Sequence, residues 1–186
     1  MKTAILLLII AAISGAKFTY SNLAADVVAV LDQLGIGRAD IIGWSDGGNT
    51  ALRLAGLHPG RVGKMILISA NYSPDGLRDP SLSNFTDGGF TRLKRWLVGS
   101  HDRLLIAEIK HLWQNYPQIS HEELNAIDTP TLVIIGEHDE ITIEHAEEMV
   151  RALPHASLHV VAGAGHHALL THANVVNDLA KAFLVP

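Results

Sequence analysis

Apolar residues alternate between two patterns along the chain. Short stretches at 41–42, 62–69, 131–136 and 157–161 are mainly apolar and contain β-branched residues, which is typical of buried strands in a parallel sheet. Apolar residues spaced three and four apart at 23–34, 50–55, 143–152 and 167–183 indicate helices. This alternation predicts an α/β fold, in which helices cover both faces of a parallel sheet.

The pattern changes between residues 71 and 128. Turn clusters such as Asp87-Gly88-Gly89 interrupt it, and amphipathic stretches at 91–98 and 103–116 lie between and after them. We therefore predict a helical lid at 71–128, inserted into a core made of residues 17–70 and 129–186. Gly35 is expected to end the first helix, and Ser21 or Asn22 to cap its start.

The N-terminal run is open to two interpretations. Lys2 precedes an apolar stretch at 4–13, and the small residues at 14–16 resemble a cleavage site, so residues 1–16 are predicted to be a signal peptide. The same run suits a buried strand of the sheet. The first interpretation predicts a secreted or periplasmic protein, and the second a cytoplasmic one.

Composition narrows the function classes. The chain has 186 residues, which suits one domain, and a formal net charge of −5, which gives no basic surface for nucleic acid or an anionic membrane. It has no cysteine, which excludes disulfides, thiolate metal sites and a cysteine nucleophile. Its 11 histidines lack metal-binding spacing, and the apolar run at 4–13 is too short to span a bilayer. We expect no metal, cofactor or membrane span.

Residues 41–51 carry the strongest chemical signal. Two β-branched residues are followed by Gly43-Trp44-Ser45-Asp46-Gly47 and then by the start of a helix. A Gly-x-Ser-x-Gly sequence between a strand and a helix is the pattern of a nucleophile elbow, in which the serine sits on a sharp turn with its hydroxyl exposed. We predict Ser45 as the nucleophile. The alternative is a glycine-rich turn without chemistry.

Two further residues follow predicted strands and could act with Ser45 in catalysis. Asp139 comes after the run at 131–136, and His166 after the run at 157–161. Ligands of open parallel sheets bind at the carboxyl ends of the strands, where these side chains would meet. A histidine there can take the serine proton, and an acid can orient the histidine. Asp139 could instead cap the next helix. The neighbouring rivals for the two roles are Glu137, Glu140 and His167.

With these motifs, the chain resembles the α/β-hydrolase fold family, and most closely its small lidded esterases, perhydrolases and amino-acid-ester hydrolases. The segments that carry the resemblance are 43–48, 130–139 and 163–166. The resemblance implies a Ser45, Asp139 and His166 triad, an oxyanion donor in the backbone N–H of Asp46, and a substrate pocket shaped by residues 71–128.

The chain also departs from that family. The usual strands before the helix near Asn22 are missing, as is the His-Gly-type loop that supplies a second oxyanion donor. The strand ending at Ile41 and Ile42 is therefore expected to be an exposed apolar edge. We expect the chain to form homo-oligomers or aggregate through that edge.

Two residues beside Ser45 are candidates for substrate binding, Trp44 and Asp46. The Asp46 carboxylate would attract a substrate amine, or it could be a tolerated polar residue satisfied by nearby backbone. The sequence as a whole predicts a serine hydrolase that cleaves a small ester, thioester or amide through an acyl-enzyme. The alternative is a hydrolase-like protein that is catalytically incomplete and self-associates through its sheet edge.

Overall fold

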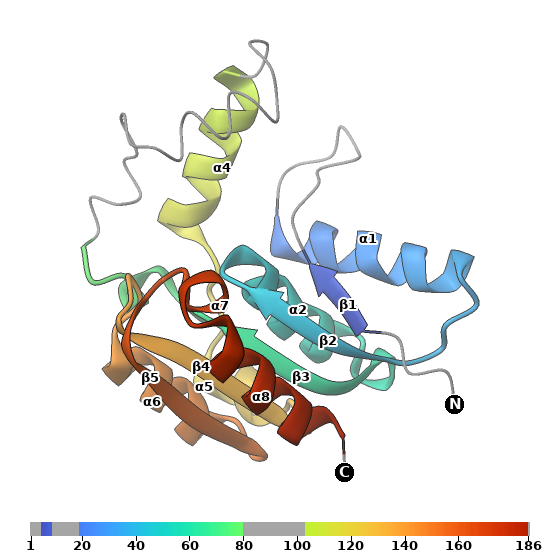
Figure 1. Ribbon diagram of the computed structural model, residues 1–186. Helices are drawn as coiled ribbons and strands as arrows, with labels where there is room; N and C mark the ends of the chain where they lie inside the picture. The colour runs from blue at the N-terminus through green and yellow to red at the C-terminus, as the bar shows by residue number, and fades with distance from the viewer. Residues whose placement is uncertain (1–4, 9–18, 80–102, 186) are drawn as a thin grey trace.

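The computed structural model describes residues 5–8, 19–79 and 103–185, and its centre is a parallel sheet. The sheet has five strands in the order β1-β2-β3-β4-β5, and every neighbouring pair is parallel (Figure 1). The strands are β1 (Ile5–Leu8), β2 (Ala39–Trp44), β3 (Val62–Ile68), β4 (Thr131–His138) and β5 (Ala156–Gly165). The predicted α/β fold is confirmed.

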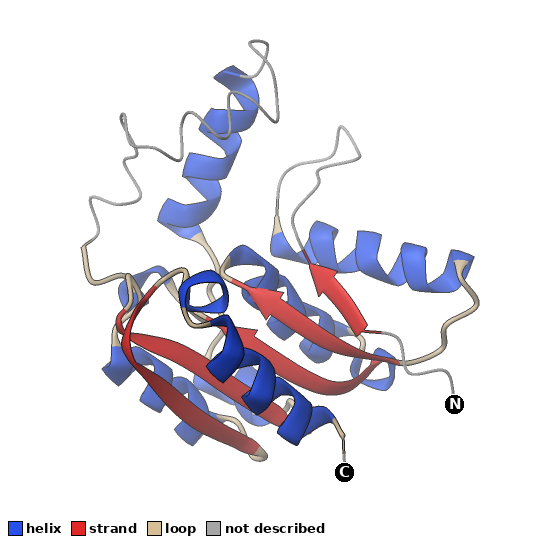
Figure 2. Cartoon of the chain, in the orientation of Figure 1, coloured by secondary structure: helices blue, strands red, loops and turns tan. Residues whose placement is uncertain are grey.

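Helices connect the strands and cover the sheet (Figure 2). The α-helices are α1 (Tyr20–Gln33), α2 (Asp46–Leu57), α4 (Arg103–Asn115), α5 (His121–Asn125), α6 (Ile143–Ala152), α7 (Ala168–Thr171) and α8 (Ala173–Leu184). Two short 3₁₀ helices are η1 (Pro59–Arg61) and η2 (Pro74–Gly76). The last predicted helix is thus two helices, since the segment breaks at His172.

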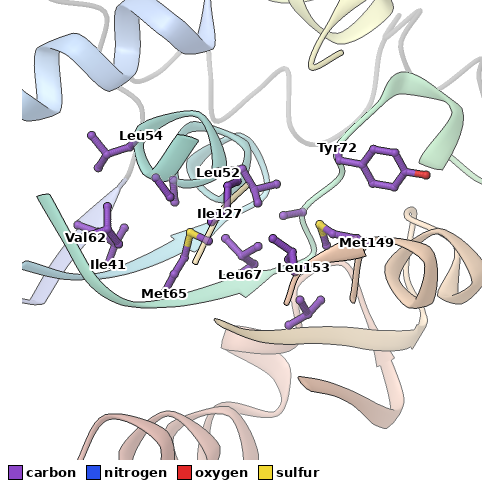
Figure 3. Close-up of a cluster of buried hydrophobic side chains, with 14 of the residues drawn as sticks. Ile41, Leu52, Leu54, Val62, Met65, Leu67, Tyr72, Ile127, Met149 and Leu153 are labelled. Carbon is purple, nitrogen blue, oxygen red and sulfur yellow. The ribbon is translucent and has the colours of Figure 1, made fainter. Parts of the chain in front are cut away.

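Alternate residues of each inner strand point to opposite faces, which produces two apolar cores. On one face, Ile41, Met65 and Leu67 pack with residues of α1, α2 and α6 (Figure 3). On the other face, Ile66 and Ile134 pack with residues of α7 and α8. A sheet buried on both faces explains why its strands are continuous apolar runs in the sequence.

Helix α1 begins before the two residues that were predicted to cap it. The hydroxyl of Thr19 accepts a hydrogen bond from the backbone N–H of Asn22 at 3.2 Å, so Thr19 is the cap, and the prediction of Ser21 or Asn22 is wrong. Those two residues are already helical. Gly35 has a φ of +65°, and it follows the helix end as expected.

The N-terminal run lies along the edge of β2 that was predicted to be exposed. Residues Ile5–Leu8 form β1 and pair with residues 40–43 of β2, so the prediction of an exposed β2 edge is wrong. The apolar run itself covers that edge. The outer strands of the described sheet are β1 and β5. Removal of residues 1–16 as a signal peptide, and self-association through a sheet edge, both stay predictions.

The described part of the predicted lid consists mainly of helices. Helix α4 rises from the body formed by the sheet and its other helices (Figure 1), and α5 follows it. Leu112 of α4 is fully buried in a small apolar cluster with Tyr20 and Leu23 of α1. Residues 80–102 of the lid lie outside the described residues. No helix in the ranges listed above is long and apolar enough to cross a membrane.

Candidate active site

Ser45 occupies the sharp turn between β2 and α2. It has a φ of +54° and a ψ of −122°, a backbone conformation that residues other than glycine rarely adopt. The turn is held by hydrogen bonds from the backbone N–H of Ser45 to the Ile68 carbonyl at 2.9 Å and from the N–H of Gly48 to the Ser45 carbonyl at 2.8 Å. Strain at a turn that presents a side chain is a feature of functional sites.

Gly43 allows β2 and α2 to approach closely behind this turn. A Cβ atom at position 43 would lie 2.6 Å from the backbone nitrogen of Gly48, and closer still to the Gly47 carbonyl. Because both neighbours are backbone, neither could move aside without shifting the helix. The elbow geometry predicted from the sequence therefore depends on this glycine.

The structure brings Ser45, Asp139 and His166 together. The hydroxyl of Ser45 lies 3.0 Å from Nε2 of His166, and Nδ1 of His166 lies 2.8 Å from Oδ1 of Asp139. The three residues follow β2, β4 and β5, whose carboxyl ends meet at one edge of the sheet. The arrangement can move a proton from the serine to the imidazole.

Asp139 is almost completely buried, with 1% of its surface exposed. Burial alone would raise the pKa of its carboxyl. The hydrogen bond and the charge of His166, together with hydrogen bonds from Ser69 and from the backbone N–H of Ile141, outweigh burial and hold the pKa below its usual value. Asp139 is therefore ionised at neutral pH and attracts a proton onto Nδ1 of His166.

The pKa of His166 is shifted in the opposite direction to that of Asp139. Burial alone would lower its pKa, but the hydrogen bond and charge of Asp139, with smaller contributions from Glu140 and Asp46, raise the pKa above 6.5. Its backbone is fixed by Trp44, whose Nε1–H donates to the His166 carbonyl at 2.9 Å. The centroid of the Trp44 ring also lies 5.7 Å from that of the imidazole, so Trp44 contacts both the backbone and the ring of His166.

The carboxylate of Asp46 is held by side chains of the protein. Its Oδ1 accepts from the Tyr20 hydroxyl at 2.7 Å, and the Trp113 Nε1–H lies 2.9 Å and 2.8 Å from its two oxygens. Burial and the charge of Asp46 raise the Tyr20 pKa well above its usual value, so the hydroxyl stays a donor. A substrate amine would have to share the carboxylate with these donors. The role of Asp46 in substrate binding stays a prediction.

We expect the Trp113 indole to anchor α4 on the elbow. Replacing Trp113 by phenylalanine keeps the apolar ring and removes the N–H, so the free energy of unfolding should fall by about 1–2 kcal/mol. A double-mutant cycle with Asp46→Asn, measured by urea denaturation, isolates this contact. If the losses in free energy of unfolding of the two single variants add up to the loss in the double variant, the two side chains do not stabilise the fold through a shared contact.

The rivals for the triad roles do not take the places of Asp139 and His166: Glu140 acts on His166 only through its charge, and Asp139 is the acid at Nδ1. The carboxylate of Glu137 accepts a hydrogen bond from the backbone N–H of Gly163 at 2.8 Å. The His167 ring packs 5.4 Å from Trp44. The partners of Asp139 and Asp46 had no sequence signal, because Ser69, Tyr20 and Trp113 reach the site only through the fold.

Other parts of the described surface offer little for a cofactor. Within residues 5–8, 19–79 and 103–185, no group of three or more His, Cys, Asp or Glu side chains is placed to hold a metal. A surface hollow of about 440 Å³ lies between α5 and α6, and residues such as His121, Glu148 and Arg151 line it. The three triad candidates are not part of its lining.

Comparison with known proteins identifies the family. The model of the alpha/beta hydrolase family matches residues 13–179, which is most of the chain. The chain belongs to the alpha/beta hydrolase family. The chain is 33% identical to the 2-hydroxy-6-oxononadienedioate/2-hydroxy-6-oxononatrienedioate hydrolase of Burkholderia vietnamiensis, in a match covering 88% of this chain and 68% of that protein.

Two further comparisons agree with this assignment. The chain is 28% identical to the 2-hydroxymuconate semialdehyde hydrolase of Pseudomonas putida, over 90% of this chain and 70% of that protein. Its fold resembles the meta-cleavage product hydrolase CumD of Pseudomonas fluorescens, with a TM-score of 0.75, 19% identity, and coverage of 91% of this chain and 72% of that one. The two relatives are named hydrolases, so the chain belongs to a family of enzymes.

Proposed function

We propose that this chain is a serine hydrolase that cleaves a small ester, thioester or amide through an acyl-enzyme intermediate. One observation carries the proposal: the continuous line of contacts from the Ser45 hydroxyl to Nε2 of His166 at 3.0 Å, and from Nδ1 of His166 to Asp139 at 2.8 Å. Membership of the alpha/beta hydrolase family supports it.

The reaction has two halves. His166 takes the Ser45 proton as the serine oxygen attacks the carbonyl carbon, and then gives that proton to the leaving group. Asp139 stabilises the imidazolium meanwhile. Water, activated by the same histidine, then cleaves the acyl-serine bond. The backbone N–H of Asp46, the first residue of α2, is the proposed donor to the oxyanion, and the helix N-terminus favours negative charge there.

The substrate class follows from this chemistry. An acyl group with a leaving alcohol, thiol or amine suits a serine nucleophile, and the mechanism uses no cofactor. Two relatives are named for hydrolysis of 2-hydroxy-6-oxo dienedioates and of 2-hydroxymuconate semialdehyde. An oxo acid of this kind therefore belongs in the substrate panel beside simple esters.

The test compares the full chain with Ser45→Ala. We expect the wild-type chain to hydrolyse p-nitrophenyl acetate and to be labelled once by a fluorophosphonate, and Ser45→Ala to do neither. Ser157→Ala, at an exposed serine of β5, is the matched control and should behave as wild type. A folded wild-type chain without turnover and without labelling would favour the catalytically incomplete alternative.

The pH dependence of kcat/KM should report the protonation of His166. Nε2 must be unprotonated to accept the serine proton, and the pKa of His166 is raised above 6.5, so kcat/KM should be lost as pH falls, with a midpoint above pH 6.5. The rate of ester hydrolysis across a buffer series gives this midpoint. His167→Gln serves as the control, and a midpoint that moved with His167 would contradict the assignment of the base.

A further inference from the structure

Ser69, directly after β3, has an unusual backbone conformation. Among the described residues other than glycine, only Ser45 and Ser69 have positive φ angles, +54° and +52°. Glycine would adopt such an angle without steric cost, whereas serine adopts it with strain. Ser69 is also 1% exposed, so its side chain gains nothing from water. The position therefore favours a residue without a side chain, unless the hydroxyl itself has a use.

The hydroxyl of Ser69 is directed at the candidate acid. Its Oγ lies 2.6 Å from Oδ2 of Asp139, which is shorter than the contacts of that carboxylate with Gly136, Ile141 and His166. It also lies 3.3 Å from the His166 carbonyl oxygen. Since a serine has one hydroxyl proton, that proton goes to the nearer and charged oxygen of Asp139.

The two oxygens of Asp139 thereby have separate partners. Oδ2 accepts from Ser69 and, at 3.2 Å, from the backbone N–H of Gly136. Oδ1 accepts from the backbone N–H of Ile141 at 3.2 Å and faces Nδ1 of His166 at 2.8 Å. Without Ser69, Oδ2 would keep only its longer contact with Gly136, and the carboxylate would be held less firmly against rotation about its Cβ–Cγ bond.

We propose that Ser69 is a positioning residue, which fixes the Asp139 carboxylate so that Oδ1 faces His166. This inference rests on the proposed function, because it gives Asp139 its orientation within the triad. Ser69 does not touch the reacting atoms, and its effect reaches the substrate through Asp139 and His166. The strain of its backbone is offset by a charge-assisted hydrogen bond in a buried site, where such bonds are strongest.

The test uses two variants that remove the same hydroxyl but differ in backbone strain. Ser69→Gly relieves the strain, and Ser69→Ala keeps it. For p-nitrophenyl acetate we expect kcat to fall about 10- to 100-fold in both variants, with KM unchanged, because a displaced catalytic group is costly even when binding is intact. The proposal would be overturned if Ser69→Gly had the wild-type kcat. It would also be overturned if the loss of kcat in the two variants followed their loss in free energy of unfolding, because the role of Ser69 would then be merely structural.

A second readout separates this proposal from the proposed function. The proton on Nδ1 of His166, hydrogen-bonded to Asp139, should give a downfield NMR signal, assigned by its loss in His166→Gln. We expect the signal to broaden or move upfield in Ser69→Gly. If wild type hydrolyses no ester and the signal still changes, the proposed function fails and the positioning role stands. If wild type is active and the signal is identical in Ser69→Gly, the positioning role fails alone.

Discussion

Replacing Asp139 by asparagine is expected to lower kcat about 10⁴-fold, with little change in KM. All four groups found around this carboxylate donate hydrogen bonds to it: the hydroxyl of Ser69, the backbone N–H groups of Gly136 and Ile141, and Nδ1 of His166. An asparagine amide would turn its NH₂ toward one of these donors. His166 can accept from that NH₂ only with the proton on Nε2, and this tautomer cannot accept the Ser45 proton.

The measurement is steady-state ester hydrolysis with circular dichroism to confirm folding. Glu140→Gln is the matched control, since it makes the same chemical change one residue away. At a pH above the pKa of His166, where the contribution of Glu140 to that pKa no longer affects the rate, it should alter kcat by no more than about twofold. Equal losses in the two variants would show that the loop needs negative charge in general, and that Asp139 has no special role.

Replacing Gly43 by alanine should lower the free energy of unfolding by about 3–5 kcal/mol, or prevent folding. The new methyl group would lie 2.6 Å from the nitrogen of Gly48, well inside contact distance, and α2 would have to move away from β2. Since α2 contributes Leu52 and Leu54 to the core, that movement would also open the packing behind the elbow. Urea denaturation measures the change.

Gly37→Ala provides the comparison for this variant. A Cβ atom at Gly37 would meet nothing within 4 Å, and its φ does not require glycine. We expect its free energy of unfolding to stay within about 1 kcal/mol of wild type, with a gain where the unfolded chain loses freedom. Similar losses in the two variants would mean that the close approach of β2 and α2 at Gly43 is not what limits stability.

Much of the fold could be predicted because its elements have clear patterns. The apolar run at 131–136 lies within β4, and the helix predicted at 143–152 has the same bounds as α6. The N-terminal run could not be assigned, because an apolar stretch with small residues after it suits both a leader and a strand. The break at His172 was missed, because apolar spacing continues across it.

The residues of the candidate site could also be predicted only in part from the sequence. Ser45 lies in a motif whose glycines and flanking elements are visible in the sequence, and the acid and histidine follow strands in the expected order. The groups that hold them are not visible in this way. Ser69 comes 70 residues before Asp139, and Trp113 comes 67 residues after Asp46. Such pairs depend on the direction of side chains in the folded protein, which spacing along the chain does not encode.

The strand order has a consequence for how the site arises during synthesis. Since the sheet order is β1-β2-β3-β4-β5, each strand that leaves the ribosome can add to the strand before it. Ser45 emerges with the second strand, while His166 lies 121 residues later, after the fifth. A nascent chain that has added β4 therefore presents a serine without its base. We expect reactivity toward acyl donors to appear only when β5 docks and brings His166 to Ser45.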